Sequence, residues 1–245
     1  MSTISDTYNQ HTYRNKIFQN DLHSFDLTID QTDLRVSLDD DYENKVFKSV
    51  YKYRRYIENY IFEHPDFLSS LKPLDFDELA PPIIKDMLYS STIVGVGPMA
   101  AVAGAIAQYV GIDCLDWSKN AIVENGGDIY INLLDNHAVI GIYAGKSPLS
   151  YRVRLKVNAY DTPLGICTSS GRIGHSLSFG KADAVCVVSK SAVLSDAAAT
   201  YLCNLFQNND DIERLLDIGL NIEGITGLVI INDDRLGVRG EIELT

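Results

Sequence analysis

The segment from Leu164 to Thr200 decides how the chain is expected to fold and where its chemistry lies. It begins Leu164-Gly-Ile-Cys-Thr-Ser-Ser-Gly-Arg-Ile-Gly-His-Ser176, an apolar run that ends in hydroxyls and continues into glycines around one histidine. The next part, Ala182-Asp-Ala-Val-Cys-Val-Val-Ser189, predicts a buried strand, and Ser195-Asp-Ala-Ala-Ala-Thr200 predicts the start of a helix. Hydroxyls, an imidazole and a carboxylate therefore gather at strand and helix ends within one short stretch.

Strands are predicted on both sides of this segment, from apolar runs that have turn residues at each end. The strongest turn signal is Gly126-Gly127, because two such runs flank it as in a tight hairpin. The expected strands are residues 25–30, 34–38, 121–125, 128–134, 138–143, 151–157, 165–169, 184–189, 227–231 and 238–244.

Helices are predicted where apolar residues recur at helical spacing. Acidic residues 39–41 begin a long helix to about residue 63. Pro98 begins another, which Gly111 ends and which carries small residues along one face. Further helices are expected at residues 83–89, 195–206 and 210–218. Hairpins with helices packed on one face favour the α+β class over alternating βαβ units.

The composition is that of an ordinary globular protein. The 245 residues are 46% hydrophobic and 22% charged, so we expect one domain over residues 1–245 with a loose N-terminal arm over 1–22. The net charge of −12 argues against a nucleic-acid partner, because phosphate binding needs a basic face. No apolar run reaches the length of a membrane span, which favours a cytoplasmic protein. The four cysteines lack C-x-x-C spacing, so neither zinc nor a disulfide scaffold is indicated.

The turn Gly95-Val-Gly97, directly before the Pro98 helix, is a first candidate site. A helix N-terminus presents unpaired N–H groups and partial positive charge, and glycines let a phosphate approach the backbone. The motif is neither a dinucleotide fingerprint nor a P-loop, so a tight turn without a ligand is the alternative interpretation.

A second candidate is Glu124-Asn-Gly-Gly-Asp128, whose simplest interpretation is the hairpin turn itself. Asn125 and Asp128 also carry groups that could read a base or a ribose. Gly126 and Gly127 would leave room for such a ligand.

A third candidate is Thr168-Ser-Ser-Gly-Arg-Ile-Gly-His175. Hydroxyls beside a histidine invite a nucleophile and base interpretation, in which Ser169 or Ser170 works with His175. The sequence lacks G-x-S-x-G and places no orienting carboxylate beside the imidazole. A histidine with a purely structural hydrogen bond is therefore the alternative.

A fourth candidate is the pair Asp196 and Thr200, which stand four residues apart on one helical face. An aspartate in a first helical turn is commonly a cap or a partner of the helix dipole. The same pair of oxygens would also serve Mg²⁺, which takes few protein ligands and completes its shell with waters and phosphates.

Taken together, these motifs resemble the ApbE superfamily, the FAD:protein FMN transferases. Within it, the chain most closely resembles an uncharacterised ApbE-like family of archaea and bacteria. The phrases that carry the likeness are Gly97-Pro-Met-Ala-Ala-Val-Ala-Gly-Ala105, Val123-Glu-Asn-Gly-Gly-Asp-Ile129, Cys167-Thr-Ser-Ser-Gly171 and Gly174-His-Ser-Leu-Ser-Phe-Gly-Lys-Ala-Asp183, within residues 25–205.

The resemblance implies a tunnelling fold (T-fold) of two intertwined halves, with antiparallel sheets. It further implies that Asp196 and Thr200 bind Mg²⁺, with the backbone carbonyl of Gly97 as a further ligand. FAD would lie against the glycine turn and the N-G-G-D loop. The implied cofactor-binding residues are Gly95, Gly97, Asn125, Gly126, Gly127, Asp128 and Thr168.

The chain departs from the transferases in two places. It has Gly97-Pro98-Met99 where they carry a lysine in an A-K-G phrase. It also has a single histidine, His175, soon after Ser169, where they have a longer insert that ends in a double histidine. Both differences bear on flavin specificity and on transferase activity.

The sequence therefore predicts a protein that binds a nucleotide or a flavin such as FAD with Mg²⁺. As an enzyme it would act on a phosphoanhydride, with His175 as acid or base and Ser169 or Ser170 holding the phosphate or the reacting group. The alternatives are a non-catalytic carrier of a flavin, pterin or deazaflavin cofactor, and a small-molecule hydrolase that uses Ser169 and His175. An acceptor protein and a homo-oligomer are further expected partners.

Overall fold

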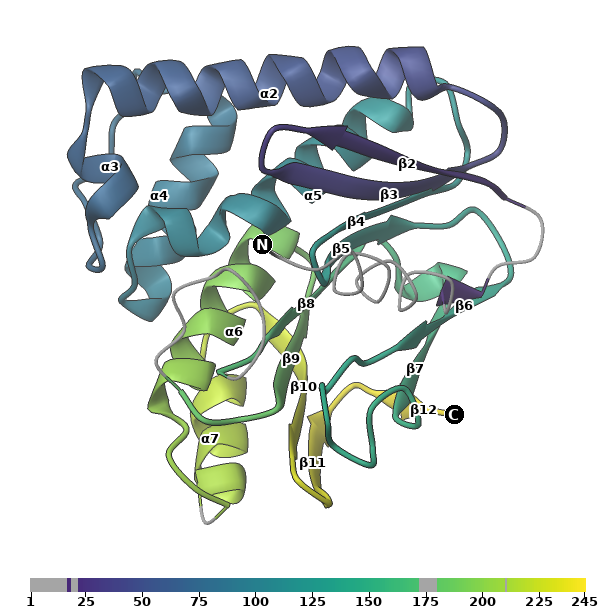
Figure 1. The fold of residues 1–245 in the computed structure, drawn as a ribbon, viewed down its shortest axis with the longest axis vertical. Helices are drawn as coiled ribbons and strands as arrows, with labels where there is room; N and C mark the ends of the chain where they lie inside the picture. Colours follow the sequence, from purple (N-terminus) through teal and green to yellow (C-terminus); the bar gives the residue numbers. More distant parts are fainter. Residues whose placement is uncertain (1–16, 19–21, 172–179, 210) are drawn as a thin grey trace, which may run out of the picture.

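The computed structural model describes residues 17–18, 22–171, 180–209 and 211–245, which form three layers (Figure 1). A large sheet stands in the middle, helices cover one of its faces, and a small sheet packs against the other. Every pair of neighbouring strands is antiparallel. This arrangement confirms the predicted α+β class.

The large sheet has eight strands, and its spatial order differs from the chain order at the centre. There the β4–β5 hairpin meets the strands of the second half of the chain, because β5 pairs with β8. The order is β11 (Arg235–Gly240), β10 (Ile225–Asn232), β9 (Ala184–Ser189), β8 (Leu164–Ser169), β5 (Asp128–Asn132), β4 (Ala121–Asn125), β3 (Thr32–Leu38) and β2 (His23–Ile29).

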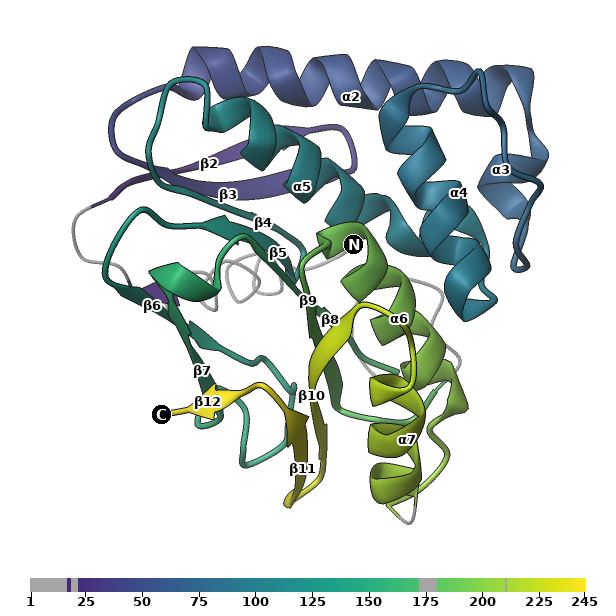
Figure 2. The same cartoon turned by 180° about the vertical axis from the view of Figure 1, so that it is seen from behind.

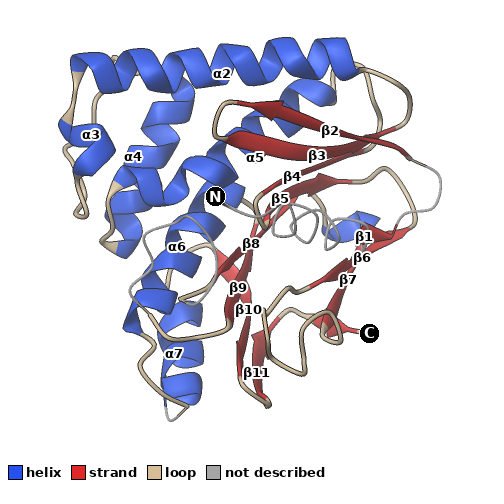
Figure 3. Ribbon diagram, viewed as in Figure 1, coloured by secondary structure: helices blue, strands red, loops and turns tan. Residues whose placement is uncertain are grey.

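The small sheet has four strands and lies on the side of the large sheet away from helices α2 to α7 (Figure 3). Its central pair, β6 and β7, forms a hairpin, and the short strands β1 and β12 pair with its two edges. The order is β1 (Ile17–Phe18), β6 (His137–Gly141), β7 (Arg154–Asn158) and β12 (Glu243–Leu244). The expected loose arm over residues 1–22 lies largely outside the described residues, but residues 17–18 pair with β6.

The helices lie on the other face of the large sheet, as Figure 2 shows from behind. The long helix α2 runs over α5 and the β2–β3 hairpin. Helix α6 packs on β8 and β9, and α7 packs on β10. The helices are α2 (Glu43–Glu63), α3 (Asp66–Ser69), α4 (Pro82–Val94), α5 (Val102–Cys114), α6 (Ala192–Leu205) and α7 (Asp211–Leu220), with short 3₁₀ turns at Pro98–Ala101 and Ala159–Asp161.

The large sheet is buried on both faces, which explains the continuous apolar runs of its central strands. On β9, Val185 and Val187 face the core beneath the helices. Ala184, Cys186 and Val188 face the core beneath the small sheet. Because side chains alternate along a strand, a run with no polar position is what a strand between two cores requires.

Helices α4 and α5 extend well beyond their predicted ends. Helix α4 continues through residues 92–94, because Val94 is buried in the core. Helix α5 continues through Gly111 to Cys114, so the prediction that Gly111 ends it is wrong. A Cβ at Gly111 would lie 2.2 Å from Cδ1 of Tyr130. Glycine is therefore required there by the close approach of a strand side chain, and not by a helix end.

Helix α2 is tied to α5 by a polar network around Asp113. The carboxylate accepts hydrogen bonds from Ser49 Oγ (2.6 Å), Lys52 Nζ (2.6 Å) and Tyr53 Oη (2.8 Å). Burial alone raises the pKa of Asp113, but the bonds from Lys52, Ser49 and Tyr53 outweigh it, so the pKa is lowered. This carboxylate is thus satisfied by its neighbours.

Among the described residues, no single helix has the length and apolar character of a membrane span. Only a pair bent by 106°, Pro82–Val94 with Pro98–Cys114, passes that test, and on length and composition alone.

Gly97 lies where the chain segment after α3 crosses the start of the Pro98 turn. A Cβ on Gly97 would lie 1.8 Å from the backbone oxygen of Ser70. Its φ of −74° is ordinary, so the close approach of Ser70, and not a left-handed backbone, requires glycine at this residue. Gly95, with φ of 81°, has that conformation and ends α4.

Gly97→Ala is expected to lower the free energy of unfolding by roughly 1–3 kcal/mol, because the added methyl group must displace the Ser70 backbone. Gly95→Ala is the matched control. It places a methyl group in open space and so reports backbone strain alone, of about 1 kcal/mol. Urea unfolding measures both. Equal stability of Gly97→Ala and the wild type would show that the segment at Ser70 moves aside without lowering the free energy of unfolding.

Candidate functional site

The β4–β5 hairpin brings the N-G-G-D motif against the start of helix α5. Gly126 and Gly127 form the predicted two-residue turn, with φ of 66° and 108°. Asn125 Nδ2 donates a hydrogen bond to the carbonyl of Ala103 (3.1 Å), and the N–H of Gly127 donates to Oε1 of Glu124 (2.7 Å). The turn is therefore fixed from both ends, while the space beside Gly126 stays open.

Asp196 meets the same start of α5 from the opposite side. Its Oδ2 accepts a hydrogen bond from the N–H of Gly104 (2.8 Å), and the N–H of Ala103 also donates to this carboxylate. Gly104 allows this approach, because a Cβ there would lie 2.8 Å from Cβ of Asp196. The carboxylate thus occupies the positive end of a neighbouring helix.

The predicted place of Asp196 in its own helix needs correction. Helix α6 begins at Ala192, and its N-cap is Ser191, whose Oγ accepts a hydrogen bond from the N–H of Leu194. Asp196 therefore lies in the second turn. It caps α5, a helix that lies far from it in sequence.

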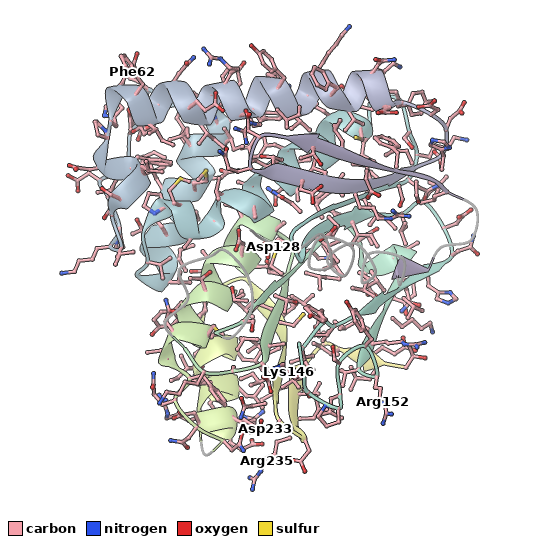
Figure 4. All side chains as sticks on the ribbon, in the orientation of Figure 1. Phe62, Asp128, Lys146, Arg152, Asp233 and Arg235 are labelled. Carbon is pink, nitrogen blue, oxygen red and sulfur yellow. The ribbon has the colours of Figure 1, made fainter. Side chains whose placement is uncertain are left out.

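Asp128 stands on the helix-facing side of the large sheet. Tyr130, two residues further along β5, belongs to the core beneath the helices, whereas Ile129 belongs to the opposite core. The Asp128 carboxylate accepts a hydrogen bond from the N–H of Thr168, and the side chain of Cys167 also lies beside it. Figure 4 shows Asp128 in the interior, between the helix layer and the sheet. Its side chain is largely buried, with Asp128 8% exposed.

The two aspartates share an environment that disfavours negative charge. Burial is the largest cause that raises the pKa of Asp128 well above its ordinary value, and repulsion by Asp196 is the next. Burial also raises the pKa of Asp196 to about 7, against the opposing effect of the Gly104 and Ala103 N–H groups. Among the described residues, no lysine or arginine forms an ion pair with either carboxylate.

Four hydroxyl residues lie near these carboxylates, three at or just after the end of β8 and one on α6. Thr200, one turn beyond Asp196 on α6, has its Oγ1 3.2 Å from Oγ of Ser169. Ser170 Oγ donates to the carbonyl of Ala182 (3.5 Å), and the Thr168 side chain contacts the thiol of Cys186. The structure therefore brings Ser169 to the proposed metal pair and turns Ser170 toward the backbone.

The glycine turn is less directly connected to the carboxylates. The Gly97 carbonyl, expected as a metal ligand, accepts the N–H of Ala100 (3.1 Å). Among the described contacts, the backbone that meets Asp196 is that of Ala103 and Gly104. His175 lies outside the described residues.

Sequence reasoning missed Glu124, Cys167 and Gly104 as parts of this site. Glu124 is 2% exposed and orients the glycine turn. Cys167 donates a hydrogen bond from Sγ to the carbonyl of Ala192 (3.3 Å) and so joins β8 to α6. An acidic residue inside a predicted buried strand was the signal for Glu124, whereas the other two depend on contacts across the fold.

The family comparison agrees with this arrangement. A family model described as AbpE of bacteria matches residues 15–221. The UPF0280 protein of Methanocaldococcus jannaschii is 40% identical over 222 residues, which cover 88% of this chain and 90% of that protein. The UPF0280 protein of Methanococcus aeolicus is 39% identical over 222 residues, which cover 88% and 89%.

Solved structures share the fold at low sequence identity. The flavin transferase ApbE from Vibrio cholerae is similar with a TM-score of 0.58 and 12% identity, over 89% of this chain and 97% of that chain. The ApbE protein from Thermotoga maritima has the same TM-score and identity, over 90% and 97%. The chain therefore belongs to an ApbE-like family whose curated members bear the name UPF0280, and it has the fold of the ApbE flavin transferases.

Proposed function

We propose that this protein binds FAD or a related flavin nucleotide with Mg²⁺ and transfers the FMN part to an acceptor protein. The observation that carries the proposal is the position of Asp196, whose buried carboxylate lies at the N-terminus of α5, one turn before Thr200. The fold shared with flavin transferases supports the same assignment. The four buried thiols suit a reducing compartment, and we place the activity in the cytoplasm.

The residues present fit a hard divalent cation. Asp196 and Thr200 offer a carboxylate and a hydroxyl oxygen on one helical face, which is the donor type that Mg²⁺ prefers. Among the described residues, no three His, Cys, Asp or Glu side chains converge to form a metal cage. Mg²⁺ is usually held by one or two carboxylates, with water and ligand phosphates completing its shell, so this site needs no such cage.

The reaction would exchange one phosphorus–oxygen bond for another. An acceptor hydroxyl attacks the FMN phosphorus, the pyrophosphate bond breaks, and AMP leaves; with water as acceptor, the products are FMN and AMP. Bound Mg²⁺ would neutralise charge on the pyrophosphate oxygens. In this scheme Ser169 orients a phosphate through its hydroxyl, Gly126 and Gly127 leave room for the ligand, and His175 accepts the proton of the attacking hydroxyl.

The test measures FAD binding to the full chain by flavin fluorescence, once in Mg²⁺ and once in EDTA. We expect affinity that depends on Mg²⁺, and chromatography should then show FMN and AMP, or flavin attached to an acceptor peptide. Binding without either product would replace the transferase by a flavin carrier. Absence of FAD binding in both conditions would contradict the whole proposal.

A further inference from the structure

Asp128 is fixed in place by backbone pairing on both sides. It pairs with Asn125 across the hairpin turn and with Cys167 on β8. Because side chains alternate along a strand, it shares the helix-facing side of β5 with Tyr130. Its carboxylate therefore points toward the layer that contains α6, and it cannot turn to solvent without a break in the sheet.

The group that faces Asp128 from this layer is another carboxylate, that of Asp196. The two repel each other electrostatically across the contact between β5 and α6. Cys167 supports this proximity independently, because its backbone pairs with Asp128 while its Sγ donates to Ala192, one turn before Asp196. Two acidic side chains from distant parts of the chain are thus brought together inside the protein.

One carboxylate oxygen of this pair is left without a protein partner. Asp128 is 8% exposed, and among the described residues its Oδ1 has no hydrogen-bond partner. Asp196, at 6% exposed, satisfies Oδ2 with the Gly104 N–H. A buried, unpaired carboxylate oxygen is costly unless a cation or a donor completes it. A cation held by both carboxylates would complete this oxygen and remove the repulsion between the two side chains.

We propose that Asp128 is a second carboxylate ligand of the divalent cation, and that Asp128 and Asp196 together bind this cation before any nucleotide is present. The inference rests on the proposed function, which assigns the cation to Asp196 and Thr200. It reassigns Asp128 from a reader of base or ribose to a metal ligand. Two opposed carboxylates supply two negative charges, so the site does not need ligand phosphates to attract a divalent ion.

The experiment titrates the full chain with Mn²⁺ in the absence of nucleotide and measures free Mn²⁺ by electron paramagnetic resonance. We expect one site in the wild type and an affinity about 100-fold or more lower in Asp128→Asn, which keeps the shape but removes a charged ligand, since second-shell changes alone cost about 10- to 100-fold. Asp113→Asn is the matched control, because its carboxylate is satisfied by Ser49, Lys52 and Tyr53. It should bind Mn²⁺ as the wild type does.

Thermal unfolding gives a second readout that does not depend on activity. In EDTA, Asp128→Asn should melt at a higher temperature than the wild type, because the repulsion between the carboxylates is gone. Mg²⁺ should raise the melting temperature of the wild type and leave that of the variant nearly unchanged. Asp128→Ser, which is smaller and also neutral, serves for the Mn²⁺ titration should the asparagine variant not fold.

Wild-type Mn²⁺ affinity in Asp128→Asn would overturn the inference, as would a wild type that binds Mn²⁺ only with FAD present. Neither result contradicts the proposed function, provided that FAD binding still requires Mg²⁺ and Asp196. Loss of Mg²⁺-dependent FAD binding in the wild type would instead remove the proposed function itself.

Discussion

Asp196→Asn is expected to weaken Mg²⁺-dependent FAD binding by about 100-fold or more, because it removes the charged ligand of the cation while second-shell changes alone cost about 10- to 100-fold. The fold should survive. An asparagine oxygen can still accept the hydrogen bonds that Gly104 and Ala103 donate to the native carboxylate. The amide nitrogen would then occupy the position of the ligating oxygen and repel the cation.

The measurement is FAD affinity by calorimetry, with Mg²⁺ and with EDTA. Thr200→Val should reduce the Mg²⁺ dependence more mildly, since it removes a neutral donor and the contact with Ser169 Oγ. Asp183→Asn controls for loss of a buried aspartate elsewhere, because Asp183 accepts the N–H of Asp233 at the β10–β11 turn. Equal affinity of Asp196→Asn and wild type, with a full response to Mg²⁺, would leave Asp196 as a cap of α5 and nothing more.

The local parts of this site could be predicted from the sequence. The N-G-G-D turn follows from two adjacent glycines between apolar runs, and both glycines adopt the left-handed backbone that such a turn requires. Asp196 and Thr200 share a helical face because four residues make about one turn. Each of these features depends on neighbours in the chain, so short patterns determine them.

The environment of each charged group could not be predicted, because distant segments create it. Asp196 reads as a first-turn aspartate, yet its hydrogen-bond donors belong to α5. Asp128 reads as a turn residue with a reachable carboxylate, and only the pairing of β5 with β8 shows that it is enclosed. The sequence around Gly97 likewise does not show that the Ser70 backbone lies where a Cβ would stand. In each case a contact between remote residues decides which chemistry remains available.

The same enclosure predicts an unusual dependence of stability on pH. Unfolded, an aspartate has a pKa of about 3.9, whereas burial raises the pKa of Asp196 to about 7 in the folded protein. The folded state therefore binds the proton more tightly than the unfolded state. This contribution to stability is fully present below about pH 4 and is lost as the pH rises through about 7. The raised pKa of Asp128 acts in the same direction.

In EDTA, the wild type should therefore lose a few kcal/mol of stability relative to Asp196→Asn between pH 5 and pH 8, since a change of one in a pKa corresponds to about 1.4 kcal/mol. Asp113 and Asp39, whose pKa values are lowered, should contribute little in this window, because their stabilisation is complete above about pH 4. Mg²⁺ should reverse the trend, since it binds the deprotonated carboxylates and so favours the folded state more at higher pH. Urea unfolding at several pH values, with EDTA and with Mg²⁺, measures both effects. Parallel curves for wild type and Asp196→Asn in EDTA would show that Asp196 stays ionised in the folded protein without a cation, and that the site is already compensated by protein groups.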